Sequence, residues 1–255
     1  MTPTTSTNTL KVALVTGAAQ GLGYVICESL LSAGYCVVVS DIDADSAQQA
    51  AQRLDNSKQK CISTKLDVMR KDDFISALAF TIETFGHCDL LVNNAAMTPT
   101  TAVMDITPEE FSQVLDINLR GNFLGCQVFG QYFADKGFGR IVNLASLAGQ
   151  MGGTASGAHY ASSKAGIMTL TKIFARQFAD KGVTVNSIAP GPVDVPSVRE
   201  KVPADKLENI INNLIPVKAM SNPQFIGSMV VMLAAVEANT VTGATWDING
   251  GIYMR

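Results

Sequence analysis

A tyrosine and a lysine that could exchange protons with a substrate, Tyr160 and Lys164, stand four residues apart. On a helix this spacing places both side chains on one face, one turn apart. A phenol titrates near ~10, and an ammonium at ~4 Å would favour its charged form by roughly 4 kcal/mol at an effective dielectric constant of ~20, which is about three pKa units. We therefore expect Lys164 to lower the pKa of Tyr160 into the range of a general acid/base. An exposed helical turn without function is the alternative, because this spacing alone is a weak pattern.

A glycine-rich turn follows the first apolar run of the chain and precedes an apolar stripe with helical spacing. It consists of Thr16, Gly17, Ala18, Ala19, Gln20, Gly21, Leu22 and Gly23. Glycines allow the backbone to approach a pyrophosphate closely, and the positive end of a helix favours its charge. In this strand–turn–helix context the turn predicts a dinucleotide site, with an ordinary tight turn as the alternative.

Asp41 ends the second apolar run, eighteen residues after Gly23. A carboxylate at this position would hydrogen-bond the adenosine ribose hydroxyls and would repel a 2′-phosphate. No cation for such a phosphate comes from Ala18, Ala19, Gln20 or Ile42. Asp41 therefore favours NAD over NADP as the cofactor, unless its side chain is simply solvated.

The segments that must position these residues alternate between two kinds. Short apolar runs predict strands at 12–16, 36–40, 62–68, 90–94, 139–146, 183–188 and 244–248. Helical patterns occupy about 22–33, 44–54, 72–85, 107–135, 160–180 and 223–236, and Thr107 with Pro108 is a strong helix start. Continuous apolar strands between helices indicate a parallel sheet covered on both faces. We predict one Rossmann-like, doubly wound α/β domain over residues 11–255, preceded by a disordered tail at 1–10.

One long insert, residues 194–222, interrupts the alternation and contains Pro196, Pro203 and Pro216. Irregular connections of this length are usually lids or binding loops. We expect an irregular substrate loop here; a solvated surface excursion is the alternative.

The composition excludes several classes of function. With 47% hydrophobic and 16% charged residues the chain can bury a large core, and a net charge of -3 with a pI near 5.4 gives no basic surface for nucleic acid. No run predicts a membrane span, and we expect no signal peptide in the Thr-rich N-terminus. Five widely spaced cysteines indicate reduced, mostly buried thiols and a cytoplasmic protein. The two histidines, His87 and His159, predict no metal site, and His159 is expected to be a bystander beside Tyr160.

Six features in order resemble the short-chain dehydrogenase/reductase family, from Lys11 to the C-terminus. They are the turn at 16–23, Asp67-Val68, Asn93-Asn94-Ala95-Ala96, Asn118, Ser146 with Tyr160 and Lys164, and Asn186 through Pro190-Gly191. Any one of them is poor evidence, but their joint spacing at predicted strand ends makes coincidence improbable.

The resemblance implies a catalytic group of four residues. Ser146 would hold the substrate oxygen beside Tyr160, and Lys164 would also bind the nicotinamide ribose. Asn118 would position, through its helix backbone, a water that relays protons to Lys164. A helix kink at Asn118 and a strand-end cap at Ser146 are the alternatives.

The same resemblance implies the residues that hold the dinucleotide. Asp67 and Val68 would border the adenine, while Asn94 and Ala95 would lie under the adenosine ribose. The full expected set is Gly17, Gln20, Gly21, Leu22, Gly23, Asp41, Ile42, Asp67, Val68, Asn94, Ala95, Tyr160, Lys164, Pro190, Gly191 and Val193. Two positions depart from the family pattern: Ala96 replaces a glycine, and Val195 replaces a hydroxyl residue that contacts the carboxamide. That contact would then come from the backbone, as at Val193, or from Asp194.

The resemblance implies an oxidoreductase that interconverts a small-molecule secondary alcohol and a ketone, and Asp41 favours NAD(H) as its cofactor. Met97, Leu147 and Met151 would line a pocket for a neutral or apolar tail. The C-terminal segment is most similar to β-ketoacyl-carrier-protein reductases, so an NADPH-dependent β-ketoacyl reductase is the first alternative. A dinucleotide-sensing protein without turnover is the second, although such a protein would be expected to lose Tyr160 or Lys164. The family resemblance also implies a homotetramer packed through the two long helices and the C-terminal segment.

Overall fold

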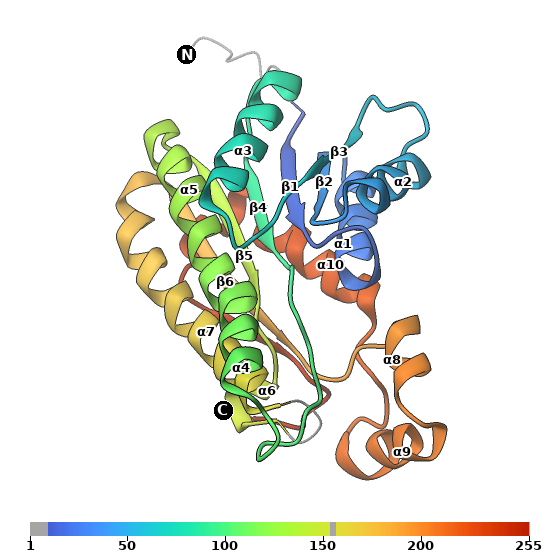
Figure 1. Cartoon of the computed structure of the whole chain (residues 1–255). Coiled ribbons are helices and arrows are strands. Elements are labelled where there is room, and N and C mark those ends of the chain that lie inside the picture. Colours follow the sequence, from blue (N-terminus) through green and yellow to red (C-terminus); the bar gives the residue numbers. More distant parts are fainter. Residues whose placement is uncertain (1–9, 154–156, 255) are drawn as a thin grey trace.

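The structure is a computed structural model that describes residues 10–153 and 157–254. Its centre is a seven-stranded sheet with the strand order β3-β2-β1-β4-β5-β6-β7, and every neighbouring pair is parallel (Figure 1). The strands are β1 Val12–Thr16, β2 Cys36–Asp41, β3 Cys61–Lys65, β4 Leu90–Asn93, β5 Gly139–Leu144, β6 Val183–Pro190 and β7 Thr245–Ile248. The chain winds outward from β1 in one direction and from β4 in the other, which confirms the doubly wound topology.

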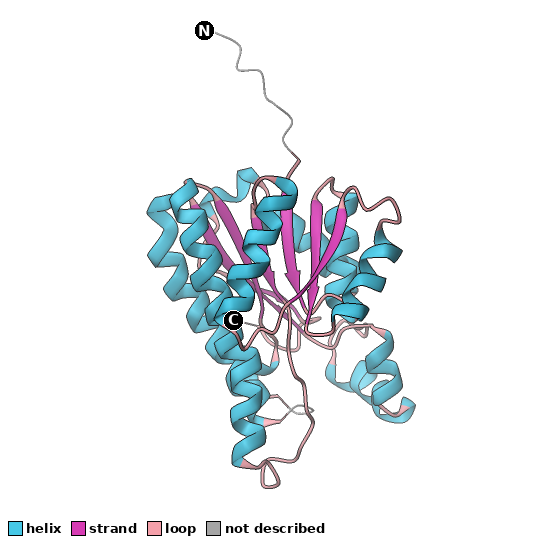
Figure 2. Cartoon of the chain, turned by 45° about the horizontal axis from the view of Figure 1, so that its top comes forward, coloured by secondary structure: helices cyan, strands magenta, loops and turns pink. Residues whose placement is uncertain are grey.

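Helices cover both faces of this sheet (Figure 2). One face packs against α1 Gly21–Ser32, α2 Ala44–Leu54 and α10 Pro223–Leu233. The other packs against α3 Lys71–Phe85, α5 Gly121–Lys136 and α7 Ala158–Phe178. Because successive strand residues point to opposite faces, both sides of a central strand must be apolar, as the five buried residues of β1 are.

Three phenylalanines fill the second face. Phe74, Phe129 and Phe133 are all fully buried, and the rings of Phe74 and Phe129 meet edge to face with centroids 6.5 Å apart. Burial of each such side chain stabilises the fold by roughly 1.5–3 kcal/mol. The rigid frame that results carries the loops at the ends of the strands.

The helix expected at 107–135 is present, but its middle turn is not α-helical. α4 Pro108–Leu115 begins with Thr107 as its N-cap, whose Oγ1 accepts from the backbone N–H of Glu110 at 3.1 Å. A π-helical turn, Asp116–Arg120, then leads into α5. Such turns concentrate at functional sites.

The strand ends differ from expectation by a few residues. β3 ends at Lys65 rather than at residue 68, because Asp67 turns the chain: its carbonyl accepts from the N–H of Arg70 and its own N–H donates to Asp73. β5 ends at Leu144 rather than at residue 146, and β6 continues to Pro190 rather than ending at 188. Two unexpected short segments, the helix α6 Ala148–Met151 and a 3-10 turn at Val236–Thr240, follow β5 and α10.

The prediction of an irregular insert at 194–222 is wrong. This segment contains α8 Pro196–Lys201, α9 Ala204–Asn209 and a π-helical turn, Ile210–Leu214. Two of its three prolines start helices instead of breaking them, since Pro196 lies in the first turn of α8 and Pro203 is the N-cap residue of α9.

Three further expectations concern the whole chain. Residues 1–9 of the predicted tail lie outside the described residues. All five cysteines are free and buried, as expected. Within residues 10–153 and 157–254, no helix combines the length and the apolar character that crossing a membrane requires.

Candidate active site

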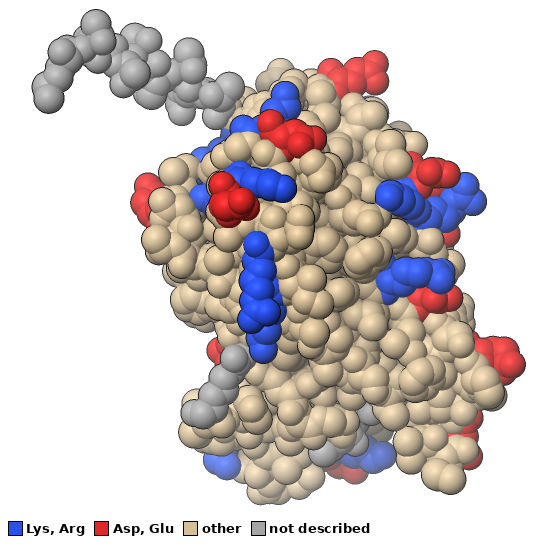
Figure 3. Space-filling view, turned by 90° about the vertical axis from the view of Figure 1, so that its left-hand side faces the viewer, with Lys and Arg blue, Asp and Glu red and all other residues tan. Residues whose placement is uncertain are grey.

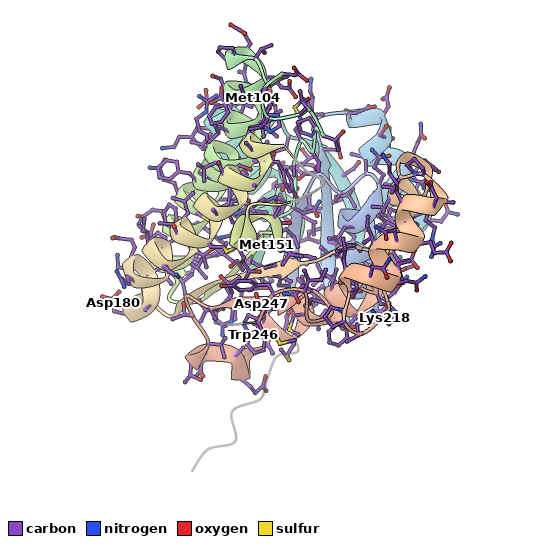
Figure 4. The ribbon with its side chains drawn as sticks, turned by 90° about the horizontal axis from the view of Figure 1, so that it is seen from below. Met104, Met151, Asp180, Lys218, Trp246 and Asp247 are labelled. Carbon is purple, nitrogen blue, oxygen red and sulfur yellow. The ribbon has the colours of Figure 1, made fainter. Side chains whose placement is uncertain are left out.

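Most of the predicted site residues meet at one edge of the sheet, where the carboxyl ends of the parallel strands lie. The glycine turn follows β1, Asn94 follows β4, Ser146 follows β5, and Pro190 ends β6. β1 and β4 are neighbours, and the strand order reverses between them, which is where doubly wound sheets bind their ligands. Figure 4 views the molecule from below, with Met151 near the centre of the view and Met104 and Asp247 on either side of it.

The glycine turn is packed on one side and open on the other. A Cβ atom on Gly23 would lie 2.5 Å from the carbonyl oxygen of Gly17, and one on Gly17 would lie 2.7 Å from the Cα of Ala95. A Cβ on Gly21, whose φ is 59°, would meet no atom within 4 Å. Because the N-cap residue Gln20 makes no side-chain cap, the first N–H groups of α1 remain free for an anion. This cradle fits the pyrophosphate of a dinucleotide.

The side chain of Asn94 holds the glycine turn in place. Its Nδ2 donates to the carbonyls of Thr16 and Gly17, both at 2.9 Å. In return, the hydroxyl of Thr16 accepts from the backbone N–H groups of Asn94 and Ala95 at 3.0 and 3.1 Å. The structure therefore gives Asn94 a role in shaping the turn, beside the ribose contact that the resemblance implies.

Asp41 lies at the end of β2 and contacts the glycine turn from one side. Its Oδ2 accepts from the backbone N–H of Ala19 at 3.2 Å. Ile42 next to it is exposed, with 59% of its surface accessible. The carboxylate thus stands where the sequence placed it, at the predicted adenosine edge of the turn.

Arg53, which sequence reasoning missed, contacts the same turn from α2. Its guanidinium donates to the carbonyl of Ala19 at 3.5 Å and lies 5.3 Å from the ring centroid of Tyr24. Among the residues that the structure describes, Arg53 makes no ion pair. A cation and Asp41 therefore flank one residue, Ala19. The sequence does not reveal that Arg53 lies near Asp41, because the two residues are twelve positions apart and only the packing of α2 brings them together.

The two residues expected near the adenine occupy different places. Asp67 Oδ1 accepts from the N–H of Met69 at 2.9 Å and so stabilises the turn after β3. Val68 lies deeper, against Gly121, and lines a small internal cavity together with Asn118 and Lys164. That cavity measures about 10 Å³, close to the space that one water molecule needs.

The expected lowering of the Tyr160 pKa by Lys164 is wrong for this arrangement. Burial raises the pKa of Tyr160, and the neighbouring hydroxyls of Ser146 and Thr98 only partly oppose this rise. The Lys164 ammonium lies 5.6 Å from the phenol ring centroid and donates to the carbonyl of Leu144 at 2.6 Å. Thr98 was not foreseen; its only signal is a position shortly after Asn94.

Lys164 is itself strongly perturbed. Its side chain is only 3% exposed, and burial lowers its pKa to about 8. An ammonium with this pKa retains its proton at pH 7 and can still release it. The pair is therefore a neutral phenol and a labile ammonium, rather than a phenolate and a fixed cation.

Asn118 lies in the π-helical turn, an irregularity of the helix at the position where a kink was the alternative. Its Oδ1 accepts from the N–H of Met97 at 2.8 Å, and its Nδ2 donates to the Met97 carbonyl at 3.0 Å and to Ser163 Oγ at 3.1 Å. The side chain clamps the segment after β4, and the kinked backbone borders the 10 Å³ cavity. A water-positioning role for this backbone remains a prediction.

The end of β6 approaches the C-terminal segment closely. A Cβ on Gly191 would lie 2.9 Å from the Cα of Asn249, and the Gly191 N–H donates to the carbonyl of Ile248 at 2.8 Å. Val193 forms an isolated bridge with Ser221, and its carbonyl accepts from the N–H of Val195 at 3.0 Å. The nicotinamide contact expected here remains a prediction.

Two other features bound the site. Leu147 is nearly buried and Met151 is 46% exposed, so the expected pocket wall is open at Met151. A cavity of about 310 Å³ lies elsewhere, at the opposite ends of the strands; Lys11, His87 and Asp89 are among its lining residues, and it contains none of the predicted site residues. Within the described ranges, no cluster of three or more His, Cys, Asp or Glu residues could hold a metal.

Comparison with known proteins gives matches over nearly the whole chain. A family model described as enoyl-(acyl carrier protein) reductase matches residues 17–253. An acetoacetyl-CoA reductase of Rhizobium meliloti (strain 1021) is 36% identical over 244 residues, which cover 96% of this chain and 99% of the relative. The 3-oxoacyl-(acyl-carrier-protein) reductase FabG of Vibrio cholerae is 36% identical over 245 residues, covering 96% and 98%. The crystal structure of gox2181 has a TM-score of 0.90 at 28% identity over 95% of each chain.

Proposed function

The chain is an oxidoreductase that belongs to the short-chain dehydrogenase/reductase family, and from this premise we propose that it interconverts a ketone and a secondary alcohol with Tyr160 as the general acid/base. The observation that carries the proposal is the convergence of Ser146, Tyr160 and Lys164 beside the glycine turn. This is a proton-transfer group placed next to a cradle that fits a dinucleotide.

At neutral pH the protonation state of Tyr160 suits the role of general acid that reduction of a ketone requires. The pKa of Tyr160 is raised by burial, so its phenol holds a proton that it can donate to a carbonyl oxygen. Ser146 lies beside the phenol and would hold the same oxygen. Lys164, with a pKa of about 8 and its ammonium 5.6 Å from the ring centroid of Tyr160, would return a proton to the phenol. The nicotinamide supplies the hydride when it is bound.

The substrate we propose is a 3-oxoacyl thioester. The names of the two curated relatives point to such substrates, acetoacetyl-CoA and a 3-oxoacyl carrier protein. The matching family model instead describes an enoyl reductase, which reduces a carbon–carbon double bond. The hydroxyls of Ser146 and Thr98 flank the proton donor Tyr160. This arrangement suits reduction of a carbonyl better than reduction of an alkene, because aligned hydrogen-bond donors stabilise the negative charge that develops on a carbonyl oxygen.

The cofactor proposal rests on Asp41, which favours NADH because a carboxylate repels a 2′-phosphate. A specific observation also supports the second candidate, an NADPH-dependent β-ketoacyl reductase: Arg53 is a cation without an ion-pair partner in the described residues, and it reaches the same turn. A dinucleotide sensor without turnover is disfavoured, because Tyr160 and Lys164 are both present, the first partly buried and the second almost fully buried.

One experiment tests both proposals. Acetoacetyl-CoA and crotonyl-CoA are each supplied with NADH and with NADPH, and nicotinamide oxidation is followed by absorbance. We expect turnover of acetoacetyl-CoA and none of crotonyl-CoA, with NADH giving the higher kcat/KM. Turnover of crotonyl-CoA alone would contradict the substrate proposal, and a higher kcat/KM with NADPH would establish the second candidate.

We also propose a cytoplasmic homotetramer. The face formed by α5 and α7 shows few charged side chains over a broad area (Figure 3), and Ile173 and Phe123 are exposed on these helices. Large exposed apolar faces mark protein contacts. Light scattering should give four times the 27.0 kDa chain mass, and a monomer would contradict this proposal.

A further inference from the structure

His159, directly before Tyr160, has no exposed surface and has two defined partners. Its Nδ1 accepts from the backbone N–H of Tyr160 at 2.9 Å, so this nitrogen carries no proton. Its Nε2, 3.1 Å from Oε1 of Glu110, is then the protonated nitrogen and donates to that carboxylate. The ring thus links the first turn of α7 to α4, which is more than the bystander role expected from sequence.

Glu110 connects this histidine to the segment after β4. The same Oε1 accepts from the hydroxyl of Thr101 at 2.6 Å. These two hydrogen bonds, that of Thr101 first, lower the pKa of Glu110, so it remains a carboxylate at neutral pH. We call these three residues, Thr101, Glu110 and His159, the carboxylate bridge.

The segment that the bridge holds, residues 94–107, also brings Thr98 to the phenol of Tyr160. It is fixed at Met97 by Asn118 and at the Pro99 carbonyl by the N–H of Gly157 at 3.3 Å. Beyond the bridge the segment reaches the surface: Met104 is 90% exposed, and Figure 4 shows it away from Met151. The bridge is therefore the last anchor before the exposed tip.

We infer that Thr101, Glu110 and His159 are positioning residues for the proposed ketone reduction. The carboxylate bridge sets the distance between the 94–107 segment and the first turn of α7. It thereby places Thr98 next to the hydroxyl of Tyr160, where the substrate oxygen would bind. This inference rests on the proposed function. The same oxygen of Glu110 accepts hydrogen bonds from Thr101 and from His159. The bridge is therefore a single unit, because loss of Glu110 releases the segment and the histidine together.

The test compares Glu110→Ala with the matched control Glu110→Gln. The glutamine retains an oxygen that can accept from Thr101 and from His159, whereas alanine removes both bonds. A misplacement of about 1 Å in an active site can cost about 100-fold in rate, so we expect kcat/KM of Glu110→Ala for acetoacetyl-CoA to fall about 10- to 100-fold. The dissociation constant for the dinucleotide, measured by nicotinamide fluorescence, should stay within about 2-fold. Glu110→Gln should recover most of the activity.

Thr101→Val keeps the inference testable if Glu110→Ala does not fold. It removes only the bond at the segment end and should lower kcat/KM in the same direction with unchanged dinucleotide affinity. The double variant should be no worse than Glu110→Ala alone, since both changes break one unit. Additive losses, an unchanged kcat/KM in both single variants, or parallel losses of dinucleotide binding would overturn the inference.

These outcomes are separable from failure of the proposed function. If the proposed function is wrong, the unmodified protein will not reduce acetoacetyl-CoA with either dinucleotide. If only the inference is wrong, the unmodified protein turns over normally and the Glu110 variants show no selective loss.

Discussion

The two sides of the cleft are built in different ways. On the dinucleotide side, contacts run through the backbone: glycines pack against main-chain atoms, and Asn94 and Thr16 bond carbonyls and N–H groups of the turn. On the substrate side, side chains from separate segments meet, as Glu110 and His159 do. Backbone contacts demand particular residues at fixed spacings, whereas side-chain contacts depend on how distant segments pack.

This difference teaches which substitutions can be absorbed. A side chain that clashes with backbone atoms of the glycine turn cannot be accommodated by a small movement, because the sheet fixes the main chain of this turn. A broken side-chain bridge leaves the frame intact and moves only a loop. We therefore expect a clash with the backbone of the glycine turn to weaken dinucleotide binding strongly, and changes on the substrate side to lower turnover while binding survives.

Lys164→Met should show the largest effect. Loss of the proton-returning group should lower kcat by about 10²- to 10⁴-fold, the usual contribution of general acid–base catalysis. At the same time the protein should become more stable at pH 7. The pKa of Lys164 falls from 10.5 to about 8, which corresponds to a cost of up to about 3 kcal/mol for burying the charge.

The pH dependence checks the sign of this effect. The cost is fully present below pH 8, where folded and unfolded chains both carry the proton, and it disappears as pH rises towards 10.5. The stability gain of Lys164→Met, measured by urea unfolding, should therefore be largest at pH 7 and shrink between pH 8 and 10. A loss of stability at pH 7 would contradict the assigned burial cost.

Gly23→Ala should break the dinucleotide side. The added Cβ would lie 2.5 Å from the Gly17 carbonyl oxygen, an atom that cannot move without opening the turn. We expect the dissociation constant for NADH or NADPH to rise at least about 100-fold, equivalent to about 3 kcal/mol. Fluorescence titration measures this change directly.

Gly137→Ala is the matched control for that substitution. Its φ of 71° is in the left-handed region, unlike that of Gly23, and an added Cβ would meet no atom within 4 Å. It should cost about 1 kcal/mol of stability and leave dinucleotide affinity unchanged. Equal losses of binding in the two variants would show that general destabilisation of the fold, not the clash at the turn, is responsible.

A pair of smaller changes should sharpen the cofactor question. Asp41→Ser removes the charge that repels a 2′-phosphate, so kcat/KM with NADPH should rise by about 10-fold. Arg53→Ala should lower kcat/KM with NADPH by a similar factor and change kcat/KM with NADH by less than about 2-fold. Equal effects of Arg53→Ala on both cofactors would exclude a role for this residue in discrimination.

The sequence alone predicted the dinucleotide side well. The parallel sheet, the turn at Gly17 to Gly23 and the position of Asp41 follow from local patterns whose backbone geometry permits few other residues. The substrate side was predicted less completely. Thr98 and Glu110 were missed there, as Arg53 was on the dinucleotide side, and His159 was taken for a bystander, because the partners of these residues are far away in the chain.

The pKa of Tyr160 shows why a correct motif can carry a wrong physical expectation. The spacing of Tyr160 and Lys164 placed both on one face of α7, as predicted. The electrostatic argument assumed that the ammonium points at the phenol oxygen, but Lys164 instead donates to Leu144. Burial then controls both groups, and no pattern in the sequence reports the depth of burial.

The central claim, that the buried phenol of Tyr160 delivers the proton, is tested most directly with Tyr160→Phe. The variant and the unmodified protein are each mixed with acetoacetyl-CoA and their preferred reduced dinucleotide in a single turnover, and dinucleotide binding is titrated separately. We predict that hydride transfer slows at least about 100-fold while the dissociation constant for the dinucleotide changes by less than about 3-fold. Hydride transfer at the unmodified rate in Tyr160→Phe would contradict the account.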